Sequence, residues 1–216
     1  MATKTIEGLT AWCNIFQPNT KFEKPHGVYD TGIILPPEEG AELCEYLEKL
    51  AKQKLEQVIK ETPENKREAL RKSLSIAEMS KDDEDKDGNP TGNLLFKTKL
   101  KPVVEKRDGT SYTQKPMVLD AGLTPMRKQI DIPRGSHVKV VTEPFPYFMP
   151  SSKTVGVSLR LKKIQIIALG DGGEDDGLEA TEGFVASAIA KDDKAEEETT
   201  TFEDNVVNAD EDEGDF

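Results

Sequence analysis

The sequence predicts a small, mostly antiparallel β-barrel with a helical insertion and an acidic C-terminal tail. Short runs of alternating or β-branched residues, separated by turn residues, recur between residues 9 and 169. Within them, residues 38–61 change to a helical period. From residue 171 to the end, 18 acidic residues face two lysines, a composition that cannot bury enough apolar surface to order itself. We therefore expect one folded domain over residues 1–170 and a disordered tail over residues 171–216.

The first two strands are expected at residues 9–18 and 27–36, which are rich in aromatic and β-branched residues and end at prolines. From Glu38 onward, leucines recur at steps of three and four residues, the pattern of an amphipathic helix over 38–61. A weaker pattern predicts a shorter second helix, so the helical insertion covers about 38–79. Packing of the leucine stripe on the barrel is the favoured interpretation, and binding of a partner protein is the alternative.

An acidic loop over residues 80–92 follows the helical insertion. Its letters Asp83-x-Asp85-x-Asp87-Gly88 match the opening of a calcium-binding EF-hand loop. That site needs a glutamate at its twelfth position, where this chain has Leu94, and helices on both sides. We therefore favour a solvated acidic turn and expect no metal.

The region from residue 94 to residue 169 is expected to be rich in strands. Residues 94–104 alternate three lysines with Phe96, Thr98 and Leu100, so one strand face would present a row of ammonium groups. An Asp-Gly pair predicts a hairpin turn at 106–109. The expected remainder is a return strand at 111–119, a connection at 122–135, a strand at 136–142, an aromatic loop at 144–149 and a last strand at 154–169.

Positive charge is concentrated on these expected strands. Residues 94–163 carry 14 Lys or Arg against five Asp or Glu, whereas residues 38–87 carry ten against 15. Aromatic residues are interleaved with the basic ones, and three of them gather around the prolines of the aromatic loop. Basic side chains attract phosphates and exposed rings stack on unpaired bases, so the combination favours binding of single-stranded nucleic acid.

Catalytic and metal-binding motifs have little support. His26 and His137 lack further ligands at zinc spacing, and no phosphate loop, nucleophile elbow or Cys-x-x-Cys pair is present. A metal-dependent nuclease using Asp108, Asp120 and Asp131 is the remaining enzymatic alternative, although turns explain the first two. We expect a protein that is not an enzyme and that needs no cofactor.

The tail ends in a free aromatic ring after a run of acids. An anionic polymer with a stackable end resembles a nucleotide strand, so the tail is expected to compete with DNA for the basic surface. When DNA displaces the tail, its acids become available to partners. The residues expected to bind partners are Asp210, Glu211, Asp212, Glu213, Asp215 and Phe216.

Several motifs resemble, in the same order, those of the single-stranded DNA-binding protein of short-tailed bacteriophages of the T-seven type. They are Gly27-Val-Tyr29, Phe96-Lys97, Gly135-Ser136 with Lys139-Val140, Pro146-Tyr147, Val155-Gly156, Gly172-Gly-Glu-Asp-Asp176, Gly183-Phe-Val-Ala-Ser187 and the closing Asp-Glu-Gly-Asp-Phe. The resemblance covers most of the chain. This chain departs from the family pattern at Met149, where the family has an aromatic residue, and in a longer loop after it.

The resemblance implies an OB fold, binding of single-stranded DNA without sequence preference, and a homodimer in which the tail takes part. It also implies roles in DNA replication, recombination, repair and strand annealing in the host cytoplasm, with no membrane, and tail contacts with the phage DNA polymerase and primase-helicase. The alternative is an acidic interaction or chaperone-like module without preference for single strands. The expected DNA-binding residues are Phe96, Lys97, Lys99, Lys101, Lys139, Phe145, Tyr147, Phe148, Lys153, Arg160 and Lys162.

Overall fold

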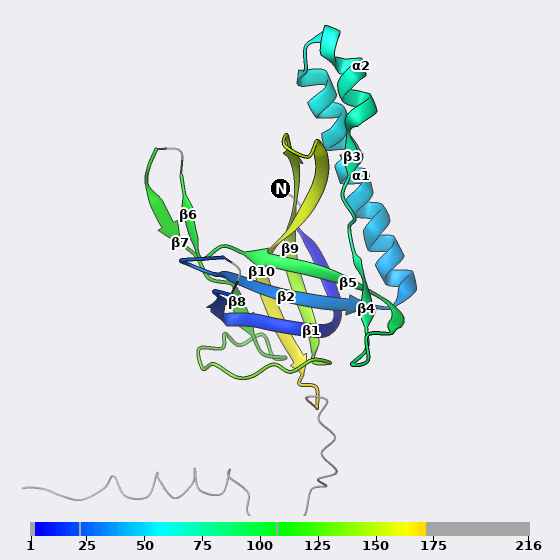
Figure 1. The fold of residues 1–216 in the computed structure, drawn as a ribbon. Helices are drawn as coiled ribbons and strands as arrows, with labels where there is room; N and C mark the ends of the chain where they lie inside the picture. Colours follow the sequence, from blue (N-terminus) through cyan, green and yellow to red (C-terminus); the bar gives the residue numbers. More distant parts are fainter. Residues whose placement is uncertain (1–2, 22, 107, 172–216) are drawn as a thin grey trace, which may run out of the picture. The chain divides into compact units, whose positions relative to one another are not determined.

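A computed structural model describes residues 3–21, 23–106 and 108–171 of the chain (Figure 1). The six tail residues expected to bind partners lie outside the described residues. The strands are β1 Lys4–Asn19, β2 Val28–Leu35, β3 Ser75–Ile76, β4 Lys81–Glu84, β5 Pro90–Leu100, β6 Val103–Glu105, β7 Ser111–Thr113, β8 Met117–Leu119, β9 His137–Met149 and β10 Thr154–Ala168. The helices are α1 Pro37–Glu61 and α2 Glu64–Ser73.

Five of the strands close into a barrel, in the order β1, β2, β5, β10, β9 and back to β1. All neighbours in this ring are antiparallel except β5 and β10, which run parallel where they meet. That contact aligns Thr98 with Leu159 and Lys99 with Arg160. A closed five-stranded barrel of this type is the OB fold, so the expected fold class is confirmed.

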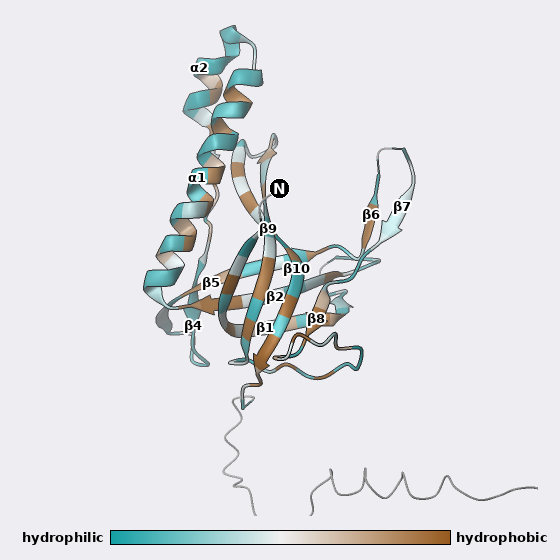
Figure 2. Cartoon of the chain, turned by 180° about the vertical axis from the view of Figure 1, so that it is seen from behind, coloured by the Kyte–Doolittle hydropathy of each residue, from teal (hydrophilic) through white to brown (hydrophobic). Residues whose placement is uncertain are grey.

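The barrel interior is filled by the inward-facing residues of the five strands. β-Branched and aromatic residues dominate it, because they pack well against a pleated surface. Phe96 is fully buried there and pairs across the sheet with Ile33. Figure 2 shows hydrophobic residues alternating with hydrophilic ones along β5, β9 and β10.

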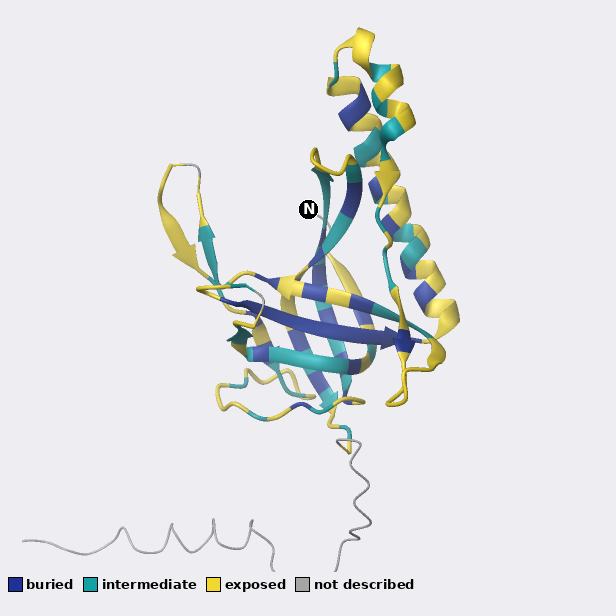
Figure 3. Cartoon of the chain, viewed as in Figure 1, coloured by how far each residue is buried: buried dark blue, intermediate teal, exposed yellow. Residues whose placement is uncertain are grey.

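Helix α1 packs on the barrel through its leucine stripe. Leu43, Leu47 and Ala51 are buried on one face, at the expected spacing. Gly40 allows close packing at the start of the helix, because a Cβ there would lie 2.9 Å from the Leu94 side chain. Helix α2 has no buried residue and follows α1 beyond the barrel (Figures 1 and 3). The two expected helices are confirmed.

Two expected loops contain strands. The aromatic run over residues 144–149 belongs to β9, which continues to Met149 and pairs with β10 as far as Thr154. Its prolines are tolerated because Pro144 and Pro146 lie within a long two-stranded hairpin, away from the centre of the sheet. The acidic region contains β4, which pairs with β5 at one edge of the sheet.

The acidic loop is held by protein groups. The buried Asp83 carboxylate accepts a hydrogen bond of 2.6 Å from Nη2 of Arg134, which ties the connection over 122–135 to β4. The Asp85 carboxylate accepts backbone N–H bonds from Asp87 and Asn89, and these bonds lower the Asp85 pKa. Both acids therefore have structural roles in the loop. Within the described part of the chain, no helix is long and apolar enough to cross a membrane.

Candidate nucleic-acid interface

A groove of about 1100 Å³ runs across one side of the barrel. We call it the basic groove. Its residues come from β1, from β5 and the residue after it, and from the extended β9–β10 hairpin. The β6–β7 hairpin with the residue after it, the start of β4 and the segment before β4 supply the rest. They are Trp12, Glu78, Met79, Ser80, Lys81, Leu95, Lys97, Lys99, Leu100, Lys101, Val104, Tyr112, Gln114, Phe145, Tyr147, Met149, Val157, Ser158, Arg160 and Lys162.

The expected row of lysines on β5 lies in this groove. Lys97, Lys99 and Lys101 are exposed, and alternation along the strand places them on one face. Closure of the barrel adds Arg160 of β10 to this row of cations, because Arg160 is aligned with Lys99 where β10 meets β5. The pairing of β5 with β10 therefore builds a continuous cationic surface from residues about sixty positions apart.

Several groove cations are paired with carboxylates of the protein itself. Lys97 Nζ lies 3.4 Å from Asp30 Oδ2, and Lys101 Nζ lies 3.9 Å from Glu23 Oε2. Lys162 Nζ lies 2.7 Å from Glu143 Oε2. Lys99 forms no ion pair with any residue that the structure describes, so its ammonium group is available to a phosphate.

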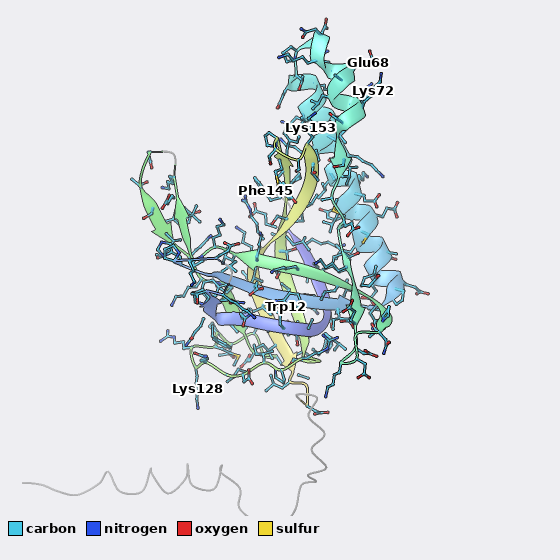
Figure 4. The ribbon with its side chains drawn as sticks, in the orientation of Figure 1. Trp12, Glu68, Lys72, Lys128, Phe145 and Lys153 are labelled. Carbon is cyan, nitrogen blue, oxygen red and sulfur yellow. The ribbon has the colours of Figure 1, made fainter. Side chains whose placement is uncertain are left out.

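Arg160 is held in the groove by an aromatic ring. Its guanidinium carbon lies 3.4 Å from the centre of the Phe145 ring, the distance of a stacked cation–π contact. Phe145, labelled in Figure 4, pairs across the β9–β10 hairpin with Ser158, two positions before Arg160 on the same strand. A planar, oriented guanidinium suits hydrogen bonding to a phosphate group.

The Tyr147 ring packs against Gly156 in the β9–β10 hairpin. It pairs across the strands with Gly156, and a Cβ at that glycine would lie 2.5 Å from Tyr147 Oη. The missing side chain therefore makes room for the ring against the neighbouring strand. The ring therefore contacts the backbone at Gly156, and the half-exposed side chain also lines the groove.

Trp12 repeats this arrangement on the barrel wall. It pairs with Gly32, and a Cβ there would lie 2.6 Å from Trp12 Cζ3. Trp12 Nε1 donates a hydrogen bond of 3.0 Å to the buried carboxylate of Asp30, which also accepts one from Asn14 Nδ2. The ammonium group of Lys97 lies 5.8 Å from the indole ring. The indole is thus fixed in orientation beside a groove cation.

Trp12 was not among the residues expected to bind DNA. Its strand has a register shift between Thr10 and Trp12, and such a bulge moves the following side chains to the opposite face. Thr10 is buried in the barrel, whereas Trp12 lines the groove. Tyr112 and Gln114 were also missed, and their hairpin reaches the groove through tertiary structure alone.

The prediction that Phe96 contacts DNA is wrong. The side chain has 0% exposure, because β5 turns it into the barrel together with Thr98 and Leu100. Neighbouring positions on a strand face opposite sides, so the residue beside Lys97 cannot reach the lysine face. Phe96 is a core residue.

Three other expected residues lie away from the basic groove. Lys139 is paired with Glu7 on β1 at 2.8 Å, and Lys153 lies in the turn at the tip of the β9–β10 hairpin (Figure 4). Phe148 alternates with Tyr147 along β9 and lines a smaller pocket beside α1, together with Lys54 and Val58. The groove gathers the other expected residues: Lys97, Lys99, Lys101, Phe145, Tyr147, Arg160 and Lys162.

The pair of Glu143 with Lys162 leads to a testable prediction. The hydrogen bond from Lys162 lowers the pKa of Glu143. A phosphate that takes over Lys162 leaves Glu143 unpaired and raises its pKa, so binding takes up a proton and strengthens as the pH falls through that raised pKa. Glu143→Gln removes the competitor, and we expect it to tighten binding of a dT oligomer about two- to fivefold at neutral pH, as for an exposed ion pair.

The measurement is fluorescence anisotropy of the labelled oligomer from about pH 4.5, near the ordinary pKa of a glutamate, up to about pH 8, where the carboxylate is ionised. Glu7→Gln is the matched control, because Glu7 pairs with Lys139 outside the groove. Weaker binding by Glu143→Gln than by the parent protein would contradict the competition between carboxylate and phosphate.

Comparison with known proteins supports the fold. No protein-family model and no curated protein matches the chain. Among solved structures, gp2.5, the single-stranded DNA-binding protein encoded by bacteriophage T7, matches with a TM-score of 0.61 and 19% identity, over 84% of this chain and 99% of that one. A C-terminal truncation of the single-stranded DNA-binding protein from bacteriophage Enc34 matches with a TM-score of 0.50 and 10% identity, over 78% and 87%. The chain has the fold of these phage proteins.

The position of the groove on the barrel is the one expected for an OB fold. Barrel strands in this fold present an outer face and connecting loops to oligonucleotides and oligosaccharides. Here β5 supplies the lysine row, and the long β9–β10 hairpin extends the wall beyond the barrel (Figures 1 and 3). Helix α1, which follows β2 in the chain, packs on the barrel and contributes no residue to the groove lining.

Proposed function

We propose that this protein binds single-stranded DNA in the basic groove without sequence preference. The observation that carries the proposal is one cavity lined by six cationic side chains and by the rings of Trp12, Tyr112, Phe145 and Tyr147. Phosphates bind the cations, and bases stack on the rings at about 1–3 kcal/mol each, whatever their identity. The role is binding and not catalysis.

The rings distinguish single from double strands in this proposal. Duplex DNA offers phosphates to a basic surface but keeps its bases stacked inside. Unpaired bases can turn toward Tyr147 and Trp12, whose rings are packed against glycines of the neighbouring strands and need little ordering on binding. Affinity for a dT oligomer is therefore expected to exceed affinity for a duplex of equal length.

A salt titration tests the electrostatic part. We expect the logarithm of the association constant to fall against the logarithm of salt concentration with a slope of about −0.7 per phosphate neutralised, or about −3 for four contacts. Lys99→Gln should make the slope shallower by about 0.7, because one phosphate contact is lost. Lys163→Gln, an exposed lysine of β10 outside the groove lining, is the matched control.

A salt-insensitive protein that binds single and double strands equally would overturn the proposal. That result would favour the acidic interaction or chaperone-like module, in which the groove cations are an ordinary solvated surface.

The acidic tail is proposed to compete with DNA for this groove. Support comes from its composition, 18 acids and a terminal Phe216, and from the cationic and aromatic lining that would accept it. Removal of residues 171–216 is expected to tighten single-strand binding, because it removes an anionic competitor tethered to the site. Anisotropy titrations of the full and shortened chains at equal salt measure this, and equal or weaker binding by the shortened chain would contradict the competition.

The broader role is also a proposal, supported by the motifs shared with the phage family. It places the protein in phage DNA replication, recombination, repair and strand annealing, in the cytoplasm of the infected host. The tail acids, from Asp210 to Asp215, and Phe216 would bind the phage DNA polymerase and primase-helicase. The protein would act as a homodimer.

A further inference from the structure

The β6–β7 hairpin carries an exposed aromatic ring that the barrel does not explain. β6 and β7 form a two-stranded sheet of their own, separate from the barrel sheet. Every residue of β7 is exposed, and Tyr112 is 45% exposed. Figure 3 shows the hairpin projecting from the barrel as a largely exposed arm. Tyr112 therefore does not stabilise a core.

One face of this hairpin points toward the basic groove. Tyr112 pairs across the hairpin with Val104, and Gln114 follows two positions later, so the three side chains share a face. All three line the groove. The ammonium group of Lys106, two positions beyond Val104, lies 5.7 Å from the Tyr112 ring centre. The groove face thus offers a ring with a cation beside it.

Other residues of the groove lining come from the β9–β10 hairpin. Phe145, Tyr147 and Arg160 repeat the same chemistry there, with rings next to a guanidinium group. Figures 1 and 2 both show the β6–β7 and β9–β10 hairpins projecting from the same end of the barrel. A strand bound in the groove therefore passes between two projecting hairpins that each carry rings and cations.

We propose that the β6–β7 hairpin is a second DNA-binding wall, in which Tyr112 stacks on an unpaired base and Lys106 contacts an adjacent phosphate. This inference rests on the proposed function and adds to it. A two-stranded sheet is marginally stable alone in water, so contact with a bound strand also orders the hairpin. Because release of the strand must break contacts on both walls, the loss of Tyr112 acts mainly on the dissociation rate.

Tyr112→Ala tests the wall, and Thr113→Ala is its matched control. Thr113 is exposed on the same strand but faces away from the groove. We expect Tyr112→Ala to bind a labelled dT oligomer about five- to thirtyfold more weakly, through faster dissociation in stopped-flow competition. Tyr112→Phe keeps the ring and should bind like the parent protein, as should Thr113→Ala. Amide hydrogen exchange of residues 103–113 in the parent protein should slow when the oligomer binds.

The outcomes separate this inference from the proposed function. If the parent protein shows no preference for single strands, the groove itself is not the site and both proposals fall. If the parent protein binds and Tyr147→Ala weakens binding, while Tyr112→Ala behaves like Thr113→Ala, only the second wall is overturned. Unchanged exchange of the hairpin amides on binding would overturn it as well.

Discussion

Replacing Phe96 with alanine is expected to lower the free energy of unfolding by about 3–5 kcal/mol, the usual cost of truncating a buried aromatic ring. The ring is fully buried in the barrel and packs with Ile33 and the other core residues. Alanine leaves a cavity that a closed barrel cannot collapse to fill. Urea denaturation followed by circular dichroism measures the change.

Phe96→Leu is the companion variant, because leucine fills much of the space and should leave a folded protein. Its affinity for a dT oligomer is expected to equal that of the parent protein. Tyr112→Ala, at an exposed ring, should leave the unfolding free energy unchanged. A Phe96→Ala protein of normal stability that had lost DNA affinity would return this ring to the binding site.

Replacing Tyr147 with alanine should weaken single-strand binding by about 1–3 kcal/mol, because a base loses its stacking surface. The ring lies in the groove beside Phe145 and Arg160, and it rests on the backbone at Gly156. Anisotropy titration with a labelled dT oligomer at fixed salt gives the loss directly. Unfolding free energy measured in parallel shows whether the variant remains folded.

Two further variants locate the cause of this effect. Tyr147→Phe keeps the ring and should bind like the parent protein. Gly156→Ala introduces a Cβ that would lie 2.5 Å from Tyr147 Oη, so it should shift the ring and weaken binding by less than the full truncation. If Tyr147→Ala bound as tightly as the parent protein, stacking at this position would be excluded.

Much of the fold could be predicted from local patterns. The leucine spacing of residues 38–61 identified α1, and the Asp-Gly turn identified the β6–β7 hairpin. Alternation along β5 correctly placed Lys97, Lys99 and Lys101 on one exposed face. The same alternation puts Phe96 on the other face, so the prediction that this ring contacts DNA conflicted with the rule used for its neighbours.

The aromatic run of β9 was expected in a loop because two prolines interrupt it. In the structure these prolines lie in a long hairpin with β10, where the glycine opposite Tyr147 accommodates its ring. The prolines of one segment do not indicate which strand will pair with it, so the pairing with β10 could not be predicted from them. Phe145 and Tyr147 were expected to line a DNA-binding groove, but they were expected in a loop and not in strand β9.

By itself the sequence determined the chain order of the five barrel strands and the two helices, the lysine row and the strongly acidic end, because these depend on composition and on backbone periods of 2 and 3.6 residues. Tertiary structure alone decided that β5 meets β10, which places Lys99 beside Arg160. It also decided that a bulge turns Trp12 outward and that Tyr112 faces the groove. The physical reason is that strand register and closure are set by packing between residues far apart in the chain, which no local period records.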